Sequence, residues 1–256
     1  MKTMPDIDQT IEQVARVLKD SKHAIAFTGA GISLESGVPT FRGNDEDNIW
    51  SRYDPEDIEI SRFMSNPAKS WKTIKDCFYF FMQDRHIEPN VAHKSLAKME
   101  EKGIVRAVIT QNIDNLHQEA GSHRVIEFHG TTRTATCVRC HKTVEASQLD
   151  MSQKIPSCDK CGGLMKPDFV FFGEGIPSEA YSESMNEAEK ADVCIVVGSS
   201  AVVMPAAMIP VKVKQNGGVL IEINPTPSAL THQYVDYYLP LGAVEAFTRI
   251  GKAIKI

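Results

Sequence analysis

The sequence TGAGISLESGVPTFRG occupies residues 28–43 and follows the apolar run Ala-Ile-Ala-Phe at 24–27. We predict a buried strand over this run, then a turn made flexible by Gly29 and Gly31, then a helix that opens just beyond. Backbone N–H groups at such a turn can approach a phosphate closely, which makes the segment a candidate anion site. A GxG after a strand is equally well explained by a structural turn. The full GxGxxG fingerprint is absent, because Leu34 stands where the third glycine belongs and no acidic residue closes a following strand.

The second half of the same segment favours a ligand over a structural turn. Phe41, Arg42 and Gly43 put an aromatic ring, a permanent cation and a glycine on a loop beside the turn. A turn needs none of these, whereas loops that carry ligands often have them.

Composition limits the classes of protein that this chain can belong to. With 256 residues, 42% hydrophobic and 24% charged, it suits one large domain, with or without a small insertion. A net charge of −5 disfavours sequence-independent binding of nucleic acid. The N-terminus lacks the pattern of a secretory signal, and no apolar stretch reaches the roughly 18 residues of a bilayer span. We therefore expect a cytoplasmic protein with no membrane partner and no direct nucleic-acid partner.

Four of the six cysteines form two CxxC knuckles, Cys137/Cys140 and Cys158/Cys161, separated by 17 residues. Two such turns facing each other supply four thiolates, which is the ligand set of a structural zinc site. The alternatives are a redox dithiol or a chance spacing. Four sulfur ligands leave no position open for water, so we expect the zinc to hold structure and not to take part in chemistry.

Strands and helices alternate along the chain at the lengths typical of a parallel, doubly wound α/β sheet. An aromatic-rich region after the glycine segment indicates helices packed beside the glycine loop, and a further helix begins at Val91 and is closed by Gly103. The zinc module interrupts the alternation at about 132–166. The further strands are predicted at 105–109, 125–128, 169–172, 193–197 and 219–223.

Polar residues follow the predicted strands at the points where they end. They include Gln111 and Asn112, His129, Ser199 and Asn224. Each has a structural explanation as a cap or a turn residue. Ligands of parallel sheets nevertheless bind at the carboxyl ends of strands, so we expect these residues to line one crevice. His129 is the candidate for acid–base chemistry, because imidazole titrates near neutrality and can take a proton from a sugar hydroxyl.

Several motifs occur in an order and spacing that resemble one family. The chain is similar, over about residues 10 to 250, to the sirtuins, which are NAD-dependent protein lysine deacylases. Besides the paired CxxC, the motifs are GAGISLESGVPTFRG (29–43), TQNIDNLH (110–117), EFHG (127–130), KPDFVFFGE (166–174), VVGSS (196–200) and EINP (222–225).

The resemblance implies a Rossmann-type NAD domain at 1–131 and 167–256, with a helical insertion at about 44–90 and a zinc module inserted at 132–166. It implies catalytic roles for His129 and Asn112, and one structural Zn²⁺ on the four cysteines. The implied peptide contacts are Val170, Phe171, Gly173, Val202 and Val203. The implied NAD contacts are Gly29, Ala30, Gly31, Ser33, Thr40, Phe41, Arg42, Gln111, Ile113, Asp114, Gly198, Ser199, Ser200, Asn224 and Ala243.

The family's chemistry transfers the acyl group of an acyl-lysine to ADP-ribose. The acyl oxygen attacks the ribose carbon as nicotinamide leaves, and an imidate forms. His129 would act as general base on a ribose hydroxyl, which then attacks the imidate carbon. Water completes the release of lysine and O-acyl-ADP-ribose, or O-acetyl-ADP-ribose from an acetyl-lysine.

One departure from the family bears on the choice of acyl group. Members that prefer succinyl- or malonyl-lysine carry a Tyr-x-x-Arg pair, whereas here Tyr79 is followed three residues later by Met82, and Arg85 falls outside the spacing. An apolar pocket would leave the carboxylate of a succinyl group desolvated and unpaired. We therefore predict a protein deacetylase, or an enzyme that removes longer apolar acyl groups, and not a desuccinylase.

Three other functions remain as alternatives. Protein mono-ADP-ribosyltransferase activity would use the same crevice and leave the label of NAD on protein. A hydride-transfer dehydrogenase is disfavoured by the incomplete fingerprint. A zinc-ribbon module that binds nucleic acid is disfavoured by the acidic balance of the chain.

Overall fold

The apolar run 24–27 forms most of the central strand of the larger sheet in the computed structural model, which describes residues 6–40, 52–80 and 86–256. This strand, β1 (Ala24–Thr28), is buried at every position. It pairs in parallel with one strand on each side, and its side chains point into apolar layers above and below the sheet.

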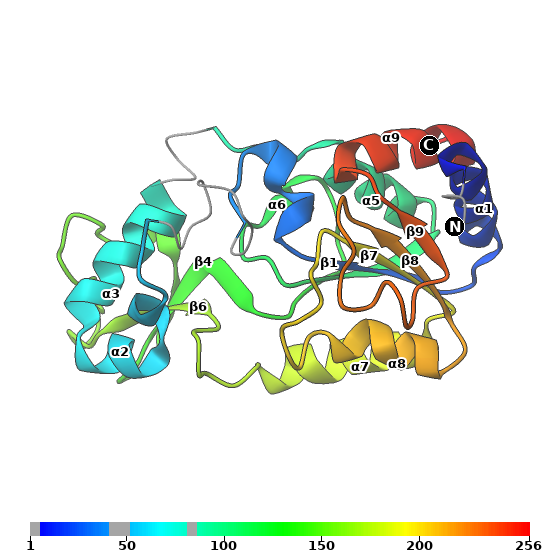
Figure 1. The fold of residues 1–256 in the computed structure, drawn as a ribbon. Helices are drawn as coiled ribbons and strands as arrows, with labels where there is room; N and C mark the ends of the chain where they lie inside the picture. The colour runs from blue at the N-terminus through cyan, green and yellow to red at the C-terminus, as the bar shows by residue number, and fades with distance from the viewer. Residues whose placement is uncertain (1–5, 41–51, 81–85) are drawn as a thin grey trace.

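The larger sheet has the strand order β3-β2-β1-β7-β8-β9, and all of its pairings are parallel (Figure 1). On one side of β1 the sheet continues with β2 and then β3. On the other side it continues with β7, β8 and β9. The topological switch point therefore lies between β1 and β7, where a ligand crevice is expected. The added strands are β2 (Val105–Thr110), β3 (Val125–Glu127), β7 (Val193–Val197), β8 (Val219–Ile223) and β9 (Tyr237–Leu239).

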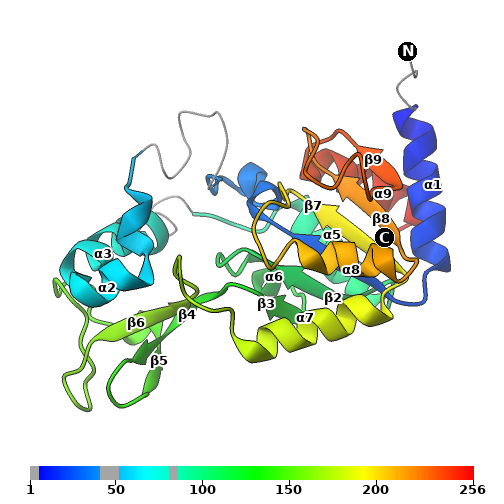
Figure 2. The ribbon, with the colours of Figure 1, turned by 60° about the horizontal axis from the view of Figure 1, so that its bottom comes forward.

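Helices cover both faces of this sheet, as Figures 1 and 2 show. One face packs on three helices through a core that includes Leu18, Leu96 and Phe247, and the other packs on two helices through Ala188 and Ile209. The predicted Rossmann-type, doubly wound α/β fold is confirmed. The helices are α1 (Ile7–Asp20), α5 (Val91–Glu101) and α9 (Ala243–Ile254) on the first face, and α7 (Ser178–Lys190) and α8 (Met208–Gln215) on the second.

A second, smaller sheet lies beside the first (Figure 2). Its strands are antiparallel in the order β5-β4-β6, with bounds β4 (Gly130–Cys137), β5 (Thr143–Glu145) and β6 (Met165–Phe169). It shares a core with helices from the aromatic-rich region, where the indole N–H of Trp71 donates to the carbonyl of Met165 at 3.0 Å. These helices are η4 (Pro55–Ile58), α2 (Ile60–Ser65), α3 (Pro67–Ile74) and the π-helical η5 (Lys75–Phe80).

The packing refines two expectations from the sequence. The aromatic residues expected beside the glycine loop pack mainly on the small sheet, where Phe78 contacts Phe169 of β6 with ring centroids 5.3 Å apart. The strand predicted at 169–172 does not join the large sheet. β6 ends at Phe169, and Phe172 pairs instead with Glu59 in an isolated bridge. Apolar character predicts burial, but it does not specify which sheet a segment joins. The exact domain boundaries stay a prediction.

Across the described ranges, no helix has both the length and the apolar character required to cross a bilayer.

Asp192 connects the start of β1 with the start of β7. Its carboxylate accepts hydrogen bonds from the backbone N–H groups of Lys22 at 2.8 Å and His23 at 3.1 Å, and from the hydroxyl of Ser21. Burial raises the pKa of Asp192, but these donors outweigh it and the net pKa is lowered. A carboxyl group whose pKa is lowered by folding stabilises the protein above its unfolded pKa, and this contribution is lost as the pH falls through the folded value.

We predict that Asp192→Asn lowers the free energy of unfolding at pH 7 by about 1–2 kcal/mol, because charged hydrogen bonds become neutral ones. The difference from wild type should shrink as the pH falls below about 4, which chemical denaturation at several pH values would measure. The exposed Asp20 provides the control variant, Asp20→Asn. An Asp192→Asn difference that stays constant down to pH 2 would contradict the assignment.

Candidate functional site

A cavity of about 520 Å³ lies at the carboxyl ends of the central strands and extends to the small sheet. It is reached by the loops that follow β1, β2, β7 and β8. The residues proposed from the sequence that line it are Gly29, Ala30, Gly31, Thr40, Gln111, Asn112, Ile113, His129, Val170, Phe171, Gly173, Gly198, Ser199, Ser200, Val203, Asn224 and Ala243.

Other proposed residues lie elsewhere. Ser33 is fully buried behind the cavity wall, where its hydroxyl donates to the carboxylate of Asp114 at 2.6 Å. Neither of these two side chains lines the cavity, and nor does Val202, which is half exposed. Phe41 and Arg42 lie outside the described residues.

The glycine turn differs from the expected anion site. No α-helix opens directly after the glycine turn in the described chain, since two short 3₁₀ turns, Ala30–Ile32 and Leu34–Ser36, occupy this segment. Gly31 instead packs on the loop after β7: its N–H donates to the carbonyl of Gly198 at 2.9 Å, and a Cβ on Gly31 would lie 2.6 Å from the Cα of Gly198. Gly31 and Gly198 must therefore lack side chains because their backbones touch. A local sequence pattern cannot reveal such a contact.

Hydrogen bonds orient the amide of Asn112, which follows β2 and is 5% exposed. Its Nδ2 group donates to the carbonyl of Gly29 and to the hydroxyl of Ser33, both at 3.2 Å. Because these two bonds use both amide hydrogens, the Oδ1 atom remains as the acceptor of this cavity-lining side chain.

A buried histidine completes this arrangement. The backbone N–H of Asn90 donates to Nδ1 of His93 at 3.3 Å, so the proton of the neutral ring is on Nε2, which lies 3.3 Å from the hydroxyl of Ser33. Burial lowers the pKa of His93 to about 4 and keeps the ring neutral. Burial also raises the pKa of Asp114, although the hydrogen bonds that its carboxylate accepts oppose this effect. Ser33 can therefore accept from His93 and Asn112 while it donates to Asp114.

His129 lies where the chain passes from β3 of the large sheet to β4 of the small one. Its Nδ1 is 3.1 Å from the carbonyl oxygen of Gln111. A carbonyl oxygen only accepts, so this contact puts the proton on Nδ1, and the lone pair of Nε2 has no hydrogen-bond partner among the residues that the structure describes. Burial lowers the pKa of His129 below its usual value, although the Gln111 carbonyl opposes this effect. The ring is therefore a neutral base at the cavity wall.

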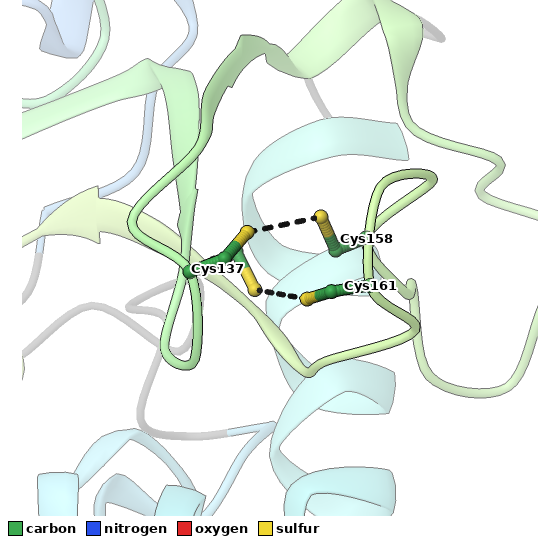
Figure 3. A group of neighbouring side chains, drawn as sticks. Cys137, Cys158 and Cys161 are labelled. Carbon is green, nitrogen blue, oxygen red and sulfur yellow. Dashed lines mark hydrogen bonds between the residues drawn. The ribbon is translucent and has the colours of Figure 1, made fainter.

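The four cysteines of the CxxC knuckles converge at one end of the small sheet (Figure 3). Their sulfur atoms all lie within 4.8 Å of one another, with 3.5 Å between Cys137 and Cys161 and 3.7 Å between Cys140 and Cys158. A tetrahedral Zn²⁺ with bonds of about 2.3 Å requires sulfur atoms roughly 3.8 Å apart, so the residues fit the metal. None of the four cysteines lines the cavity.

Sequence reasoning missed part of the cavity wall and the buried His93 behind it. Ile58 and Phe78 come from the helical region and reach the cavity only through tertiary packing, so nothing in their local spacing could identify them. The additional lining residues are Leu34, Glu35, Ile58, Phe78, Phe169, Phe172, Glu174, Ile176, Met204, Ile223, Pro225, Thr226 and Gly242.

Comparison with known families agrees with this geometry. The model of the Sir2 family matches residues 29–205. The chain belongs to the Sir2 family. The resemblance to sirtuins, the enzyme class and the fold with a cysteine module are thereby confirmed.

Named relatives and solved structures match the chain over nearly its whole length. It is 41% identical to NAD-dependent protein deacylase 1 of Archaeoglobus fulgidus, over 95% of this chain and 98% of that protein. It is 44% identical to the NAD-dependent protein deacylase of Pyrococcus abyssi, over 96% and 98%. A Sir2 structure with deacetylated p53 peptide and 3′-O-acetyl-ADP-ribose matches with a TM-score of 0.88 at 37% identity, over 94% and 97%.

We predict that the purified protein contains about one zinc ion per chain and that Cys158→Ala reduces this to about zero, because three thiolates hold the metal far less tightly than four. Elemental analysis measures the metal, and thermal unfolding should show a lower midpoint for the variant. Cys194→Ala is the control, since Cys194 is buried within β7 away from the cluster. A zinc-free wild-type protein, or a Cys158→Ala variant with full zinc, would refute the site.

Proposed function

We propose that this chain is an NAD-dependent protein lysine deacylase that transfers the acyl group of an acyl-lysine to ADP-ribose and releases nicotinamide. The observation that carries the proposal is the neutral ring of His129, whose Nε2 is free beside a cavity formed by strand ends. The named relatives support the same activity.

NAD⁺ is the cosubstrate, and it supplies a glycosidic bond to nicotinamide that breaks while the ribose takes the acyl group. We assign Gln111, Asn112, Ile113 and Asp114 to the nicotinamide end, because they follow β2 near His129. The free Oδ1 of Asn112 is available to accept a hydrogen bond there, while Asp114 acts from behind the wall through Ser33. The loops after β7 and β8, with Gly198, Ser199, Ser200 and Asn224, take the adenosine end.

His129 acts as the general base in this scheme. Its Nε2 accepts the proton of a ribose hydroxyl as that hydroxyl attacks the acyl carbon, and the Nδ1–H bond to the Gln111 carbonyl holds the ring in place. Phe41 and Arg42 keep their proposed cofactor roles, although they lie outside the described residues.

The peptide is proposed to lie along residues 170–173, opposite Val202 and Val203. Main-chain hydrogen bonds would then bind substrates of varied sequence. Two contacts refine this picture. The side chain of Phe171 is 1% exposed, and its backbone N–H donates to Glu174 at 3.0 Å. Phe171 therefore supports the wall from within. Its neighbours Val170 and Phe172 also use their backbone N–H groups within the protein, on the carbonyls of His129 and Ile58, so fewer main-chain groups of this segment remain for a peptide.

The acyl end of the cavity is apolar on the side of the small sheet, where Ile58, Phe78 and Phe169 line it. None of the described lining residues is a lysine or an arginine. Tyr79 does not line the cavity, and its hydroxyl donates to the carbonyl of Thr132 at 3.1 Å. Met82 and Arg85 lie outside the described residues. An acidic acyl group would have no cation to pair with among the described residues.

We expect the protein to deacetylate an acetyl-lysine peptide only when NAD⁺ is present, and His129→Ala to lower kcat/KM by about 10²–10⁴-fold. Because the base must be neutral and the pKa of His129 is lowered, activity should fall only as the pH drops below about 6.5. His123→Ala, at an exposed position, is the control. NAD-independent turnover, or full activity of His129→Ala, would overturn the mechanism. Label from NAD⁺ retained on protein would favour ADP-ribosyl transfer.

For acyl choice, we expect kcat/KM for a succinyl-lysine peptide to be about 10–100-fold below that for the acetyl peptide of the same sequence, because the extra carboxylate is desolvated without a partner. A butyryl peptide controls for size and should be accepted. Equal rates on the succinyl and acetyl peptides would contradict the apolar pocket.

A further inference from the structure

Glu222 is a buried acid on β8, whose other residues are apolar. It lies on β8 between Val196 of β7 and Tyr238 of β9, and its side chain is 0% exposed. Alternation along the strand puts it on the same side of the sheet as Leu220, which belongs to the apolar core beneath α7 and α8. Burial of a carboxylate there is costly unless donors compensate it.

The donors found in the described part of the chain come from the loop that follows the same strand. The hydroxyl of Thr231 donates to the carboxylate of Glu222 at 2.6 Å, and the backbone N–H of Ser228 donates to it at 3.2 Å. The Ser228 N–H also contacts the Thr231 hydroxyl at 2.7 Å, and the hydroxyl of Ser228 accepts from Leu230 at 3.1 Å. The carboxylate therefore anchors a turn at 228–231.

This anchored turn lies directly behind part of the cavity wall. Between the end of β8 and the turn, Asn224, Pro225 and Thr226 line the cavity. The loop is also attached to the neighbouring strand end, because the N–H of Ala229 donates to the carbonyl of Ser200 at 3.2 Å. The chain at 224–226 is thus held at one side by β8 and at the other by the turn on Glu222.

We propose that Glu222 is a positioning residue for the adenosine half of NAD. Its carboxylate holds the turn at 228–231, and the turn sets the path of residues 224–226 at the cavity wall. The inference rests on the proposed function. In the order of the sheet, β2, β1 and β7 separate this wall from His129, which follows β3. Loss of the anchor should therefore weaken cofactor binding while it spares the chemical step.

The test compares Glu222→Gln and Thr231→Val with wild type. We expect the Kd of ADP-ribose, measured by calorimetry, and the KM for NAD⁺ to rise together by about ten-fold in each variant, because a charged hydrogen bond is lost. The kcat and the KM for the acetyl peptide should stay within about two-fold of wild type. Thr231→Ser, which keeps the hydroxyl, should restore the wild-type Kd.

Glu100→Gln is the matched control. The carboxylate of Glu100 also anchors a loop, through the N–H groups of His123 and Arg124, but none of these residues lines the cavity. This variant should lower thermal stability without changing the Kd of ADP-ribose.

Two outcomes would overturn the inference alone. One is a wild-type Kd in both Glu222→Gln and Thr231→Val, and the other is a fall in kcat at constant KM, which indicates only a loss of folded protein. If wild-type protein fails to bind ADP-ribose at all, the proposed function fails as well.

Discussion

The cavity depends on one contact between two backbones, at the switch point of the sheet. Gly31 follows β1 and Gly198 follows β7, and a Cβ on the first would lie 2.6 Å from the Cα of the second. The hydrogen bond from Gly31 to Gly198 joins the same two loops. A side chain at either position would force the strand ends apart, and the polar residues that follow each strand would no longer face a common space. The shape of the site therefore depends first on the close packing of these two loops, and its polar side chains depend on that packing for their positions.

Buried polar groups then orient the residues that face the cavity. Ser33 has both lone pairs and its proton engaged by His93, Asn112 and Asp114, so it directs the Asn112 amide without facing the cavity itself. Glu222 occupies a similar place behind the loop after β8. In both cases a polar group that is costly to bury is satisfied by donors or acceptors from the loops that it positions. Breaking one of these hydrogen bonds leaves a buried polar group unpaired, which costs free energy. The groups of such a network are therefore held in one arrangement.

Sequence reasoning succeeded where the signal lies in a short window and failed where it depends on packing between distant segments. The strands, the CxxC pairs and the strand-end histidine are encoded by neighbouring residues, so the fold class, the cysteine cluster and most of the cavity wall could be predicted. The 3₁₀ turns after Gly31 could not be, because the backbone of Gly198, far along the chain, determines that path. The motif at 29–43 predicts that Ser33 contacts a ligand, and only the tertiary structure shows that its side chain lies behind the cavity wall. Ile58 comes from a helical region whose packing on the small sheet has no local signature.

The small sheet links the cysteine cluster to the cavity wall at 170–173, although no cysteine reaches the cavity. The small sheet packs on the shared aromatic core and carries the cysteine cluster, and both stabilise it. β4 begins at Gly130, directly after His129, and Gly130 pairs with Phe169 at the end of β6. The pairing is so close that a Cβ on Gly130 would lie 2.0 Å from the carbonyl oxygen of Asp168. The same pairing thus controls both the direction in which the chain leaves the large sheet at His129 and the start of the segment 170–173. Through this pairing, a metal ion on the cysteine cluster can set the distance between His129 and the segment 170–173.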